Sequence, residues 1–562
     1  MKKIILTILS VCFFTGFLLA QDKHNITVKA NKPGAEIQPT MWGIFFEDIN
    51  MAADGGIYAE LVKNRSFEFS KPMDGWTVQP VGDRPYQPFQ KQFGEGTVVI
   101  VNREDKNAVN PRFIRITTNN ATKDSLGLTN EGFRGMGIKK DMRYDFSLMY
   151  RNKTPGLKMH VELVDSTGTV LGSTMFTPRE ADGNWHKQAE TFTANATEAK
   201  AKLTIWFEGS GIIDLDMISL FPEDTWKNRP GGLRADLVQM LADLKPGFVR
   251  FPGGCIVEGR ELATRYQWKK TIGPVEDRQL IINRWNTEFA SRSTPDYFQT
   301  FGLGFFEYFR LAEDIGAEPL PILNCGMACQ FNTAEVATLD QIDPYLQDAL
   351  DLVEFANGDV NTQWGAVRAK LGHPEPFNLK MMGVGNENWG PQYIDRFKIF
   401  QKGLKEKYPQ LKIIASTSAE YQGERFNYLN TEFKTLQPEL ADEHYYNSPS
   451  WFLQNTARYD NYDRSGPAIF AGEYAAHSSH TGNTENKNSL RTAVSEAAFM
   501  TGLERNADIV HMASYAPLLA RVDAWQWKPD LIWFDNLNVY ATPDYYVQKL
   551  FSNNKGTNVL PT

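Results

Sequence analysis

Two glutamates, Glu387 and Glu473, each stand where an apolar run of the sequence stops. One run begins at Leu379 and the other at Ile469, and a glycine falls one or two residues before each glutamate. A strand that ends in this way delivers a carboxyl group to the rim of a sheet. Cleavage of a glycosidic bond needs one carboxylic acid that protonates the leaving oxygen and one carboxylate that acts at the anomeric carbon or on a water. The pair therefore predicts this chemistry, although either glutamate alone is explained equally well by an ion pair or a cap.

Asn386 directly precedes Glu387. Adjacent residues of an ideal strand point to opposite faces, so both side chains can serve one pocket only if the backbone kinks where the strand ends. The Asn386 amide could then donate to the substrate hydroxyl beside the anomeric carbon, in a bond that strengthens as charge develops. We therefore predict that Asn386 binds substrate.

Apolar strands that alternate with helices must position these glutamates. Helices are expected over 233–244, 305–315, 342–355, 393–405 and 490–505, and strands near residues 41, 248, 318, 379, 411, 442, 468 and 509. Strands separated by helices pair in parallel, and eight such units close into a (β/α)₈ TIM barrel, which carries its catalytic groups at the carboxyl ends of the strands. Glu387 then ends the fourth strand and Glu473 the seventh.

Between about Gly75 and Pro222 the sequence changes to short alternating runs separated by glycine, asparagine and aspartate. Regularly spaced short strands of this kind predict a β-sandwich. The segment 201–220 resembles the closing strands of carbohydrate-binding modules, and a purely structural insert is the alternative. The predicted fold class is α/β, a TIM barrel with an inserted β-sandwich.

The N-terminus has the pattern of a secretory signal peptide. Two lysines precede an apolar stretch from Ile4 to Leu19, and Ala20 supplies a small residue at the cleavage point. A membrane anchor is the alternative, but the apolar run is short for a span. We expect export to the periplasm or the cell exterior, with no membrane association of the mature form.

Composition argues against several kinds of partner and cofactor. The 562 residues carry a net charge of −8 with no basic run beyond the N-terminus, which is unlike a nucleic-acid-binding protein. After the signal peptide the cysteines are Cys255, Cys325 and Cys329, an odd number that predicts no disulfide framework. We expect no cofactor and no metal, because Cys325 and Cys329 lack a second ligand pair. A homo-oligomer is left open.

Several motifs together resemble one glycosidase family. Gly385-Asn386-Glu387 with Gly472-Glu473-Tyr474 is similar to the clan of retaining (β/α)₈ glycosidases. Within that clan, the segments 43–50, 64–68, 250–259, 268–274 and 301–304 resemble α-L-arabinofuranosidases of glycoside hydrolase family 51. The resemblance covers roughly 40–70 and 226–540.

The resemblance implies a retaining exo-α-L-arabinofuranosidase that removes terminal arabinofuranosyl residues from arabinan, arabinoxylan or related plant polysaccharides. Glu387 would be the acid/base and Glu473 the nucleophile, with carboxylates about 5 Å apart. The pKa of Glu387 is expected to be raised by burial and by the charge of Glu473. Another retaining glycosidase of the clan, such as an endoglucanase or xylosidase, is one alternative, and a non-catalytic carbohydrate-binding protein is another.

Other site residues follow from the same resemblance. Glu47 matches a ligand of sugar hydroxyls, with an ion pair to Arg250 or to another barrel residue as the alternative. Cys255 would be a neutral contact in the pocket or a structural thiol. The remaining candidates are His444, Tyr446, whose hydroxyl would hold Glu473, and Asn324, which is equally explained as a cap.

The expected domain division follows these boundaries. Family members usually end in a C-terminal β-sandwich, so the last residues are interpreted as the start of one that is truncated or absent, leaving apolar surface on the barrel. The segments are a signal peptide over 1–20, an N-terminal strand and first βα unit over 21–74, the inserted sandwich over 75–222, the rest of the barrel over 223–540 and the C-terminal segment over 541–562. Within the second segment we expect a strand at 25–30 and a helix at 55–62.

Overall fold

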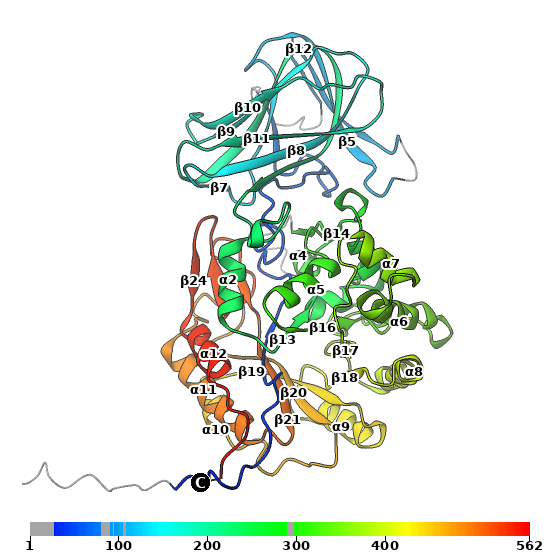
Figure 1. Ribbon diagram of the computed structural model, residues 1–562, viewed down its shortest axis with the longest axis vertical. Helices are drawn as coiled ribbons and strands as arrows, with labels where there is room; N and C mark the ends of the chain where they lie inside the picture. The colour runs from blue at the N-terminus through cyan, green and yellow to red at the C-terminus, as the bar shows by residue number, and fades with distance from the viewer. Residues whose placement is uncertain (1–26, 80–89, 94, 105–107, 289–296, 562) are drawn as a thin grey trace, which may run out of the picture.

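The computed structural model describes residues 27–561 except 80–89, 94, 105–107 and 289–296. The predicted signal peptide and the first two residues of the strand expected at 25–30 lie outside the described residues. In Figure 1 a β-rich unit stands above a larger unit in which helices surround a sheet. The two units have separate hydrophobic cores.

The larger unit is a closed parallel barrel, so the predicted fold class is confirmed. The last strand pairs with the first, Trp42 lying opposite Ala513. The barrel strands in order are β1 (Trp42–Phe45), β13 (Phe248–Phe251), β16 (Glu318–Leu323), β17 (Met381–Val384), β18 (Lys412–Ser416), β19 (Leu440–Asn447), β20 (Ala468–Ala476) and β21 (Val510–Tyr515).

The barrel strands are almost continuously apolar because both of their faces are covered. Every residue of β13 and of β17 is buried. Large side chains such as Phe248 and Ile322 fill the interior, and glycines on neighbouring strands leave room for them. A Cβ at Gly43 would lie 2.3 Å from the Phe248 ring, and one at Gly383 would lie 2.3 Å from Ile322 Cδ1.

Helices cover the outside of the barrel. They are α2 (Ala235–Asp243), α5 (Phe305–Asp314), α6 (Asp343–Asn357), α7 (Gln363–Lys370), α8 (Pro391–Lys407), α9 (Glu424–Leu436), α10 (Pro449–Gln454), α11 (Leu490–Arg505) and α12 (Pro543–Asn553). Local sequence explains their starts: Pro391 opens α8, and the Ser489 hydroxyl caps α11 by accepting from the Thr492 amide. Short elements of the connections are α3 (Cys255–Glu258), α4 (Arg284–Glu288), η1 (Trp226–Asn228), η2 (Leu262–Thr264), η3 (Trp268–Thr271), η4 (Val275–Asp277), η5 (Leu339–Gln341), β14 (Ile281–Ile282), β15 (Phe298–Gln299), β22 (Leu519–Arg521), β23 (Ile532–Phe534) and β24 (Val539–Ala541).

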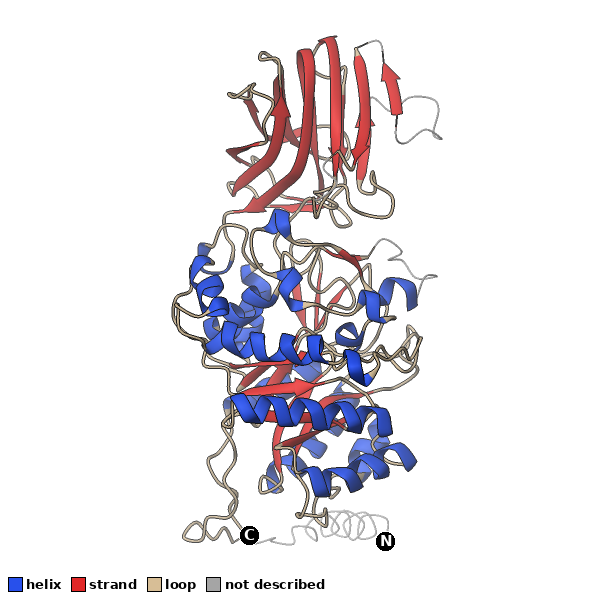
Figure 2. Ribbon diagram, turned by 90° about the vertical axis from the view of Figure 1, so that its right-hand side faces the viewer, coloured by secondary structure: helices blue, strands red, loops and turns tan. Residues whose placement is uncertain are grey.

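The upper unit is an antiparallel β-sandwich inserted between β1 and β13 (Figure 2). Its long strand β12 belongs to both sheets: Ile205 pairs with β6 and β9, and Leu215 pairs with β5 and β8. The strands are β2 (Trp76–Gln79), β3 (Gln90–Phe93), β4 (Gly96–Asn102), β5 (Arg112–Ala121), β6 (Gly127–Asn130), β7 (Met136–Ile138), β8 (Arg143–Asn152), β9 (Lys158–Val164), β10 (Val170–Phe176), β11 (His186–Thr193) and β12 (Glu198–Pro222).

Two expectations for the N-terminal segment are wrong. Residues 55–62 form turns and an extended connection instead of a helix. The Leu61 amide donates to the Leu220 carbonyl, and Tyr58 forms a β-bridge with Leu233. This backbone therefore pairs with the last strand of the inserted sandwich and with the segment that follows it. Residues 27–30 are not a strand, although the Lys29 amide donates to the Pro561 carbonyl.

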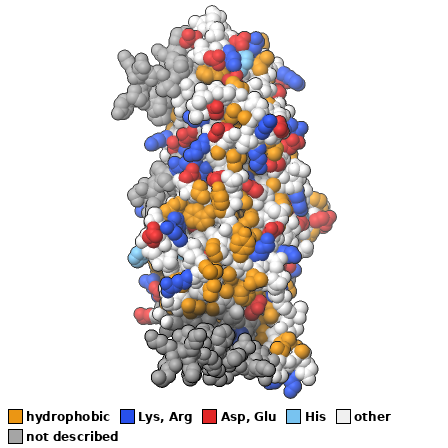
Figure 3. Space-filling model, turned by 90° about the vertical axis from the view of Figure 1, so that its left-hand side faces the viewer, with side chains coloured by type: hydrophobic (Ala, Val, Ile, Leu, Met, Phe, Trp, Pro, Cys, Tyr) orange, Lys and Arg blue, Asp and Glu red, His pale blue; other side chains and the backbone are white. Residues whose placement is uncertain are grey.

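The segment 541–562 begins with helix α12, which packs on the barrel, and continues as a tail beside residues 29–37. Exposed apolar side chains gather on the face that α11 and α12 form (Figure 3), including Leu490, Val494, Tyr546 and Leu550. Among the described residues, none of the helices has the length and apolar character needed to cross a membrane.

Candidate active site

The backbone turns sharply where β17 ends. Gly385 has a φ of 75° and Glu387 a φ of 30°, a conformation that residues with a side chain rarely adopt. The Asn388 side-chain oxygen fixes the turn by accepting a hydrogen bond from the backbone amide of Asn386 at 3.1 Å. A Cβ at Gly385 would lie 2.5 Å from that oxygen, so glycine is required there. The expected kink is therefore present, and substrate binding by Asn386 stays a prediction.

The two predicted catalytic glutamates face one another across His444. One oxygen of Glu387, one oxygen of Glu473 and a ring nitrogen of His444 all lie within 4.8 Å of one another. His444 Nδ1 lies 2.9 Å from Glu387 Oε1, and Nε2 lies 3.6 Å from Glu473 Oε1. The strand register explains part of this arrangement, because His444 on β19 stands beside Glu473 on β20.

Tyr446 and Arg250 hold the Glu473 carboxylate from two sides. The Tyr446 hydroxyl donates to Glu473 Oε2 at 2.7 Å, as the resemblance implies. Arg250 Nη2 lies 3.0 Å from Glu473 Oε1 and also donates to Asn386 Oδ1 at 2.7 Å. Arg250 further pairs with Asp442 at 3.2 Å and is completely buried. This guanidinium therefore connects both predicted catalytic segments.

Arg250, Asp442 and Glu258 are absent from the sequence-based set of site residues. The Glu258 carboxylate accepts from Asn386 Nδ2 at 3.3 Å and from Asn388 Nδ2 at 2.9 Å, so it braces the turn that carries Glu387. The signal that was available is a charged residue inside a buried apolar strand, as Arg250 is in β13.

Glu47 lies at the end of β1, where its carboxylate accepts from the Ile256 amide at 3.2 Å. Glu47 does not form the ion pair with Arg250 that was the alternative, because Arg250 pairs with Asp442 and Glu473. Burial, and then the charge of Glu473, raises the pKa of Glu47 to about 8. Glu47 is therefore protonated at neutral pH.

Cys255 and Asn324 have different surroundings. Cys255 Sγ lies 3.6 Å from Glu387 Oε2, in the site. Asn324 uses its side chain on its own loop: Nδ2 donates to the Met327 carbonyl at 2.8 Å, and Oδ1 accepts from the Gly326 amide at 2.7 Å. We therefore interpret Asn324 as a residue that braces the loop after β16, which corrects its prediction as a substrate ligand.

The expected rise in the pKa of Glu387 is wrong for this structure. Burial alone would raise that pKa, but the hydrogen bond and charge of His444, followed by the charge of Arg250, lower it overall. Burial and the charge of Glu387 raise the pKa of Glu473. Burial lowers the pKa of His444, but Glu473 and Asp442 outweigh it and raise the value to about 10. The proton shared by this group therefore resides on the imidazole, between the carboxylates.

Among the described residues, two clusters have the spacing of metal ligands: Glu387, His444 and Glu473 form one, and Cys255, Glu258 and Cys329 the other. In the first, Arg250 and a protonated His444 already supply positive charge. In the second, Arg284 Nη2 lies 3.2 Å from Cys329 Sγ. A cation in either cluster would face an existing positive charge.

Comparisons with known proteins agree with this geometry. The family model described as "Alpha-L-arabinofuranosidase 1 domain" matches residues 240–464, and the one described as "Alpha-L-arabinofuranosidase C-terminal domain" matches residues 472–562. "Alpha-L-arabinofuranosidase 1" of Arabidopsis thaliana is 36% identical over 94% of this chain and 74% of its own length. The solved structure of an arabinose-bound GH51 α-L-arabinofuranosidase has a TM-score of 0.81 and 33% identity, and covers 95% of this chain and 83% of its own. The chain belongs to the α-L-arabinofuranosidases of glycoside hydrolase family 51.

A second relative of this GH51 member is an "Extracellular exo-alpha-L-arabinofuranosidase" of Streptomyces chartreusis. It is 43% identical over 96% of this chain, and the chain spans 62% of its length. The first family model includes the residues from Arg250 to Tyr446, and the second begins one residue before Glu473. The predicted family is thus confirmed over both halves of the catalytic barrel.

The GH51 chain should lose stability as the pH rises through the pKa of His444. This pKa is raised from 6.5 to about 10 in the folded protein, so the stabilisation is complete below pH 6.5 and is lost as the pH approaches about 10. We expect the free energy of unfolding to fall over this range, and to fall less steeply in His444→Gln. Denaturant unfolding at several pH values and constant ionic strength measures the free energy of unfolding of the wild type and of His444→Gln. His186→Gln, on the sandwich, is the control. Parallel pH curves for the wild type and His444→Gln would refute the assignment.

Tyr446→Phe should lower kcat and leave KM nearly unchanged. Burial raises the pKa of Tyr446 far above its ordinary value, so the hydroxyl stays protonated and donates to Glu473. A lost hydrogen bond to a charged group is worth about 1.5–3 kcal/mol, which corresponds to a loss of about 10- to 100-fold. Steady-state kinetics would test this, with Tyr540→Phe on the exposed edge of β24 as the control. An unchanged kcat in Tyr446→Phe would show that the bond has no part in turnover.

Proposed function

We propose that the protein is a retaining exo-α-L-arabinofuranosidase that removes terminal arabinofuranosyl residues from arabinan, arabinoxylan or related plant polysaccharides. The convergence of Glu387 and Glu473 within 4.8 Å carries the proposal. Retaining glycosidases have carboxyl groups about 5–5.5 Å apart, whereas inverting enzymes keep about 6.5–9.5 Å to admit a water. The names of the relatives support the choice of sugar.

In this proposal Glu473 attacks the anomeric carbon while Glu387 protonates the departing oxygen. The resulting glycosyl ester is then hydrolysed by a water that Glu387 deprotonates. Arg250 and Tyr446 fix the Glu473 carboxylate for attack, and Arg250 also orients the side-chain amide of Asn386. Glu47, protonated at neutral pH, has a hydroxyl that can donate to the sugar.

We assign the catalytic proton to the pair formed by Glu387 and His444. In the substrate-free site the imidazole holds this proton, 2.9 Å from Glu387 Oε1. A sugar that fills the site removes water around Glu387 and so disfavours its charged form. Transfer of the proton from Nδ1 to Oε1 then makes Glu387 the acid that protonates the leaving oxygen.

We also propose that the protein is exported and that its inserted sandwich is a carbohydrate-binding module. The N-terminal pattern of charged, apolar and small residues supports export, and the Streptomyces relative is named as extracellular. The two-sheet architecture supports the second proposal. Retention of the separately expressed segment 75–222 on insoluble arabinoxylan, compared with cellulose, would test it; recovery of the segment entirely in the wash would contradict it.

Hydrolysis of a panel of substrates tests the proposed activity. We expect release of nitrophenol from nitrophenyl α-L-arabinofuranoside and of free arabinose from arabinan, arabinoxylan or arabinogalactan. Faster release from nitrophenyl β-xyloside, or chain cleavage of a β-glucan, would favour the xylosidase or endoglucanase alternative. No release from any glycoside would favour a non-catalytic carbohydrate-binding protein.

A further inference from the structure

We propose that Cys255 and Cys329 form an oxidisable dithiol beside Glu387, and that peroxide converts it to a disulfide that inactivates the site reversibly. The activity readout of this inference depends on the proposed function, whereas formation of the bond does not. The two cysteines come from different parts of the chain. Cys255 opens helix α3 after β13, and Cys329 lies in the loop after β16.

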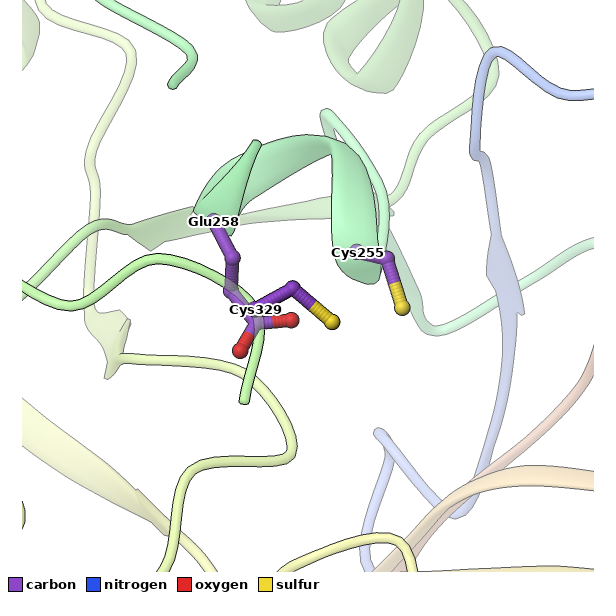
Figure 4. Close-up of side chains that lie close together, drawn as sticks. All are labelled: Cys255, Glu258 and Cys329. Carbon is purple, nitrogen blue, oxygen red and sulfur yellow. The ribbon is translucent and has the colours of Figure 1, made fainter. Parts of the chain in front are cut away.

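The two sulfur atoms share one small space. Sγ of Cys255, Sγ of Cys329 and a carboxylate oxygen of Glu258 lie within 4.8 Å of one another, and both sulfurs project into the same gap between α3 and the loop (Figure 4). The backbones are also tied together, because the Cys329 amide donates to the Gly259 carbonyl at 3.2 Å. A disulfide needs Cα atoms within about 7 Å of one another, and this hydrogen bond holds the two segments side by side.

The charges around the pair favour one thiolate and one thiol. Arg284 Nη2 donates to Cys329 Sγ at 3.2 Å, and Cys329 is buried. The hydrogen bond from Cys255, followed by the charge of Arg284 acting against burial, lowers the pKa of Cys329 to about 6. The same hydrogen bond, together with burial, raises the pKa of Cys255. The pair therefore holds one proton between two sulfurs at neutral pH, which is the reactive form of a dithiol.

The position of Cys255 connects this pair to catalysis. Cys255 is only partly buried, so a small oxidant can reach the pair from the site. The Sγ of Cys255 lies 3.6 Å from Glu387 Oε2. In a disulfide, Cys255 Sγ would bond to Cys329 Sγ and leave its place 3.6 Å from Glu387 Oε2. The strained turn at Glu387 would then lose one of its contacts, and displacement of a catalytic group by 1 Å can cost about 100-fold in rate.

The chemistry balances with hydrogen peroxide as the oxidant. The Cys329 thiolate attacks one peroxide oxygen as the O–O bond breaks, giving a sulfenic acid on Cys329 and hydroxide, which takes a proton from solvent to become water. Cys255 Sγ then attacks Cys329 Sγ, the S–O bond breaks, and the departing hydroxide takes the proton of Cys255 to become the second water. One thiolate, one thiol, one peroxide and one proton from solvent give one disulfide and two waters, so the sulfurs lose two electrons and the peroxide gains them.

The other cysteine of the described chain supplies a matched control. Cys325 is buried, its Sγ lies 3.8 Å from Asn388 Oδ1, and burial raises its pKa to about 12. Its thiol is therefore protonated at neutral pH and should not react under conditions that oxidise the pair. Cys325→Ser should keep the peroxide response of the wild type, and Cys329→Ser should lose it.

The experiment treats the full protein with hydrogen peroxide and measures two quantities on the same samples. Peptide mapping without reduction should recover Cys255 and Cys329 in one cross-linked species, two hydrogen atoms lighter than the separate peptides. Arabinofuranosidase activity should fall in parallel, by about 10- to 100-fold, and return after treatment with dithiothreitol. Each variant is compared with its own untreated activity, and the mapping stands without any variant.

Different results separate the possible failures. Absence of the cross-link, with both cysteines free or one converted to a sulfinic acid, would overturn the inference even if activity falls. A cross-link that leaves activity unchanged would overturn the assignment to the site. If the untreated protein releases no arabinose, the proposed function fails, and the peptide mapping alone still decides whether the disulfide forms.

Discussion

Glu473→Ala should abolish turnover, with a loss in kcat on the order of 10⁵-fold, because the variant lacks the carboxylate that forms the covalent intermediate. Glu473 is buried between Arg250 and Tyr446, so no neighbouring water can simply take its place. The fold should persist, because Arg250 keeps its contacts with Asp442 and Asn386.

Steady-state release of nitrophenol measures the loss, and circular dichroism checks the fold. A small anion such as azide or formate should restore part of the activity of Glu473→Ala, because it can enter the space that the side chain leaves. Glu406→Ala, on the exposed surface of α8, is the control for a lost glutamate and should retain full activity. Turnover by Glu473→Ala within tenfold of the wild type would refute the nucleophile assignment.

Glu387→Ala should show a loss that depends on the leaving group. An alkyl arabinofuranoside needs a proton to depart, so its kcat/KM should fall by about 10²- to 10⁴-fold. Dinitrophenolate departs without a proton, so kcat/KM for that substrate should change little. Hydrolysis of the intermediate should become slow with both substrates, because Glu387 also activates the water.

A series of aryl arabinofuranosides of graded leaving-group acidity measures this dependence. The logarithm of kcat/KM for Glu387→Ala should rise steeply with leaving-group acidity, whereas the wild type should show a shallow slope. Glu387→Gln is a matched variant that keeps the shape and a hydrogen bond to His444. Equal losses for all leaving groups would remove Glu387 from the role of acid.

The sequence predicts the barrel well because its strands are buried on both faces. The strand expected near residue 248 begins at Phe248, and the helix at 490–505 has the predicted boundaries, since an apolar run and an amphipathic period leave little ambiguity there. The helix expected at 55–62 fails for the opposite reason. Its backbone groups bond to Leu220 and Leu233, which lie far along the chain, and no local pattern reports such partners.

The same distinction separates the site residues. Glu387 and Glu473 can be found because each ends an apolar run, which is a local feature. The pKa of Glu387 cannot, because its direction is set by His444, a residue brought beside it by the closure of the barrel. Glu258 contacts Asn386 and Asp442 contacts Arg250, each from a distant part of the chain. Their roles in the site therefore cannot be predicted from the local sequence.

Mapping of a covalent intermediate tests the central claim most directly. Glu387→Ala is mixed with dinitrophenyl α-L-arabinofuranoside, quenched with acid within the first turnover and digested for mass spectrometry. The account predicts one arabinosyl group per chain, attached to Glu473. An adduct on another residue, or no adduct together with a first product of inverted anomeric configuration, would contradict it.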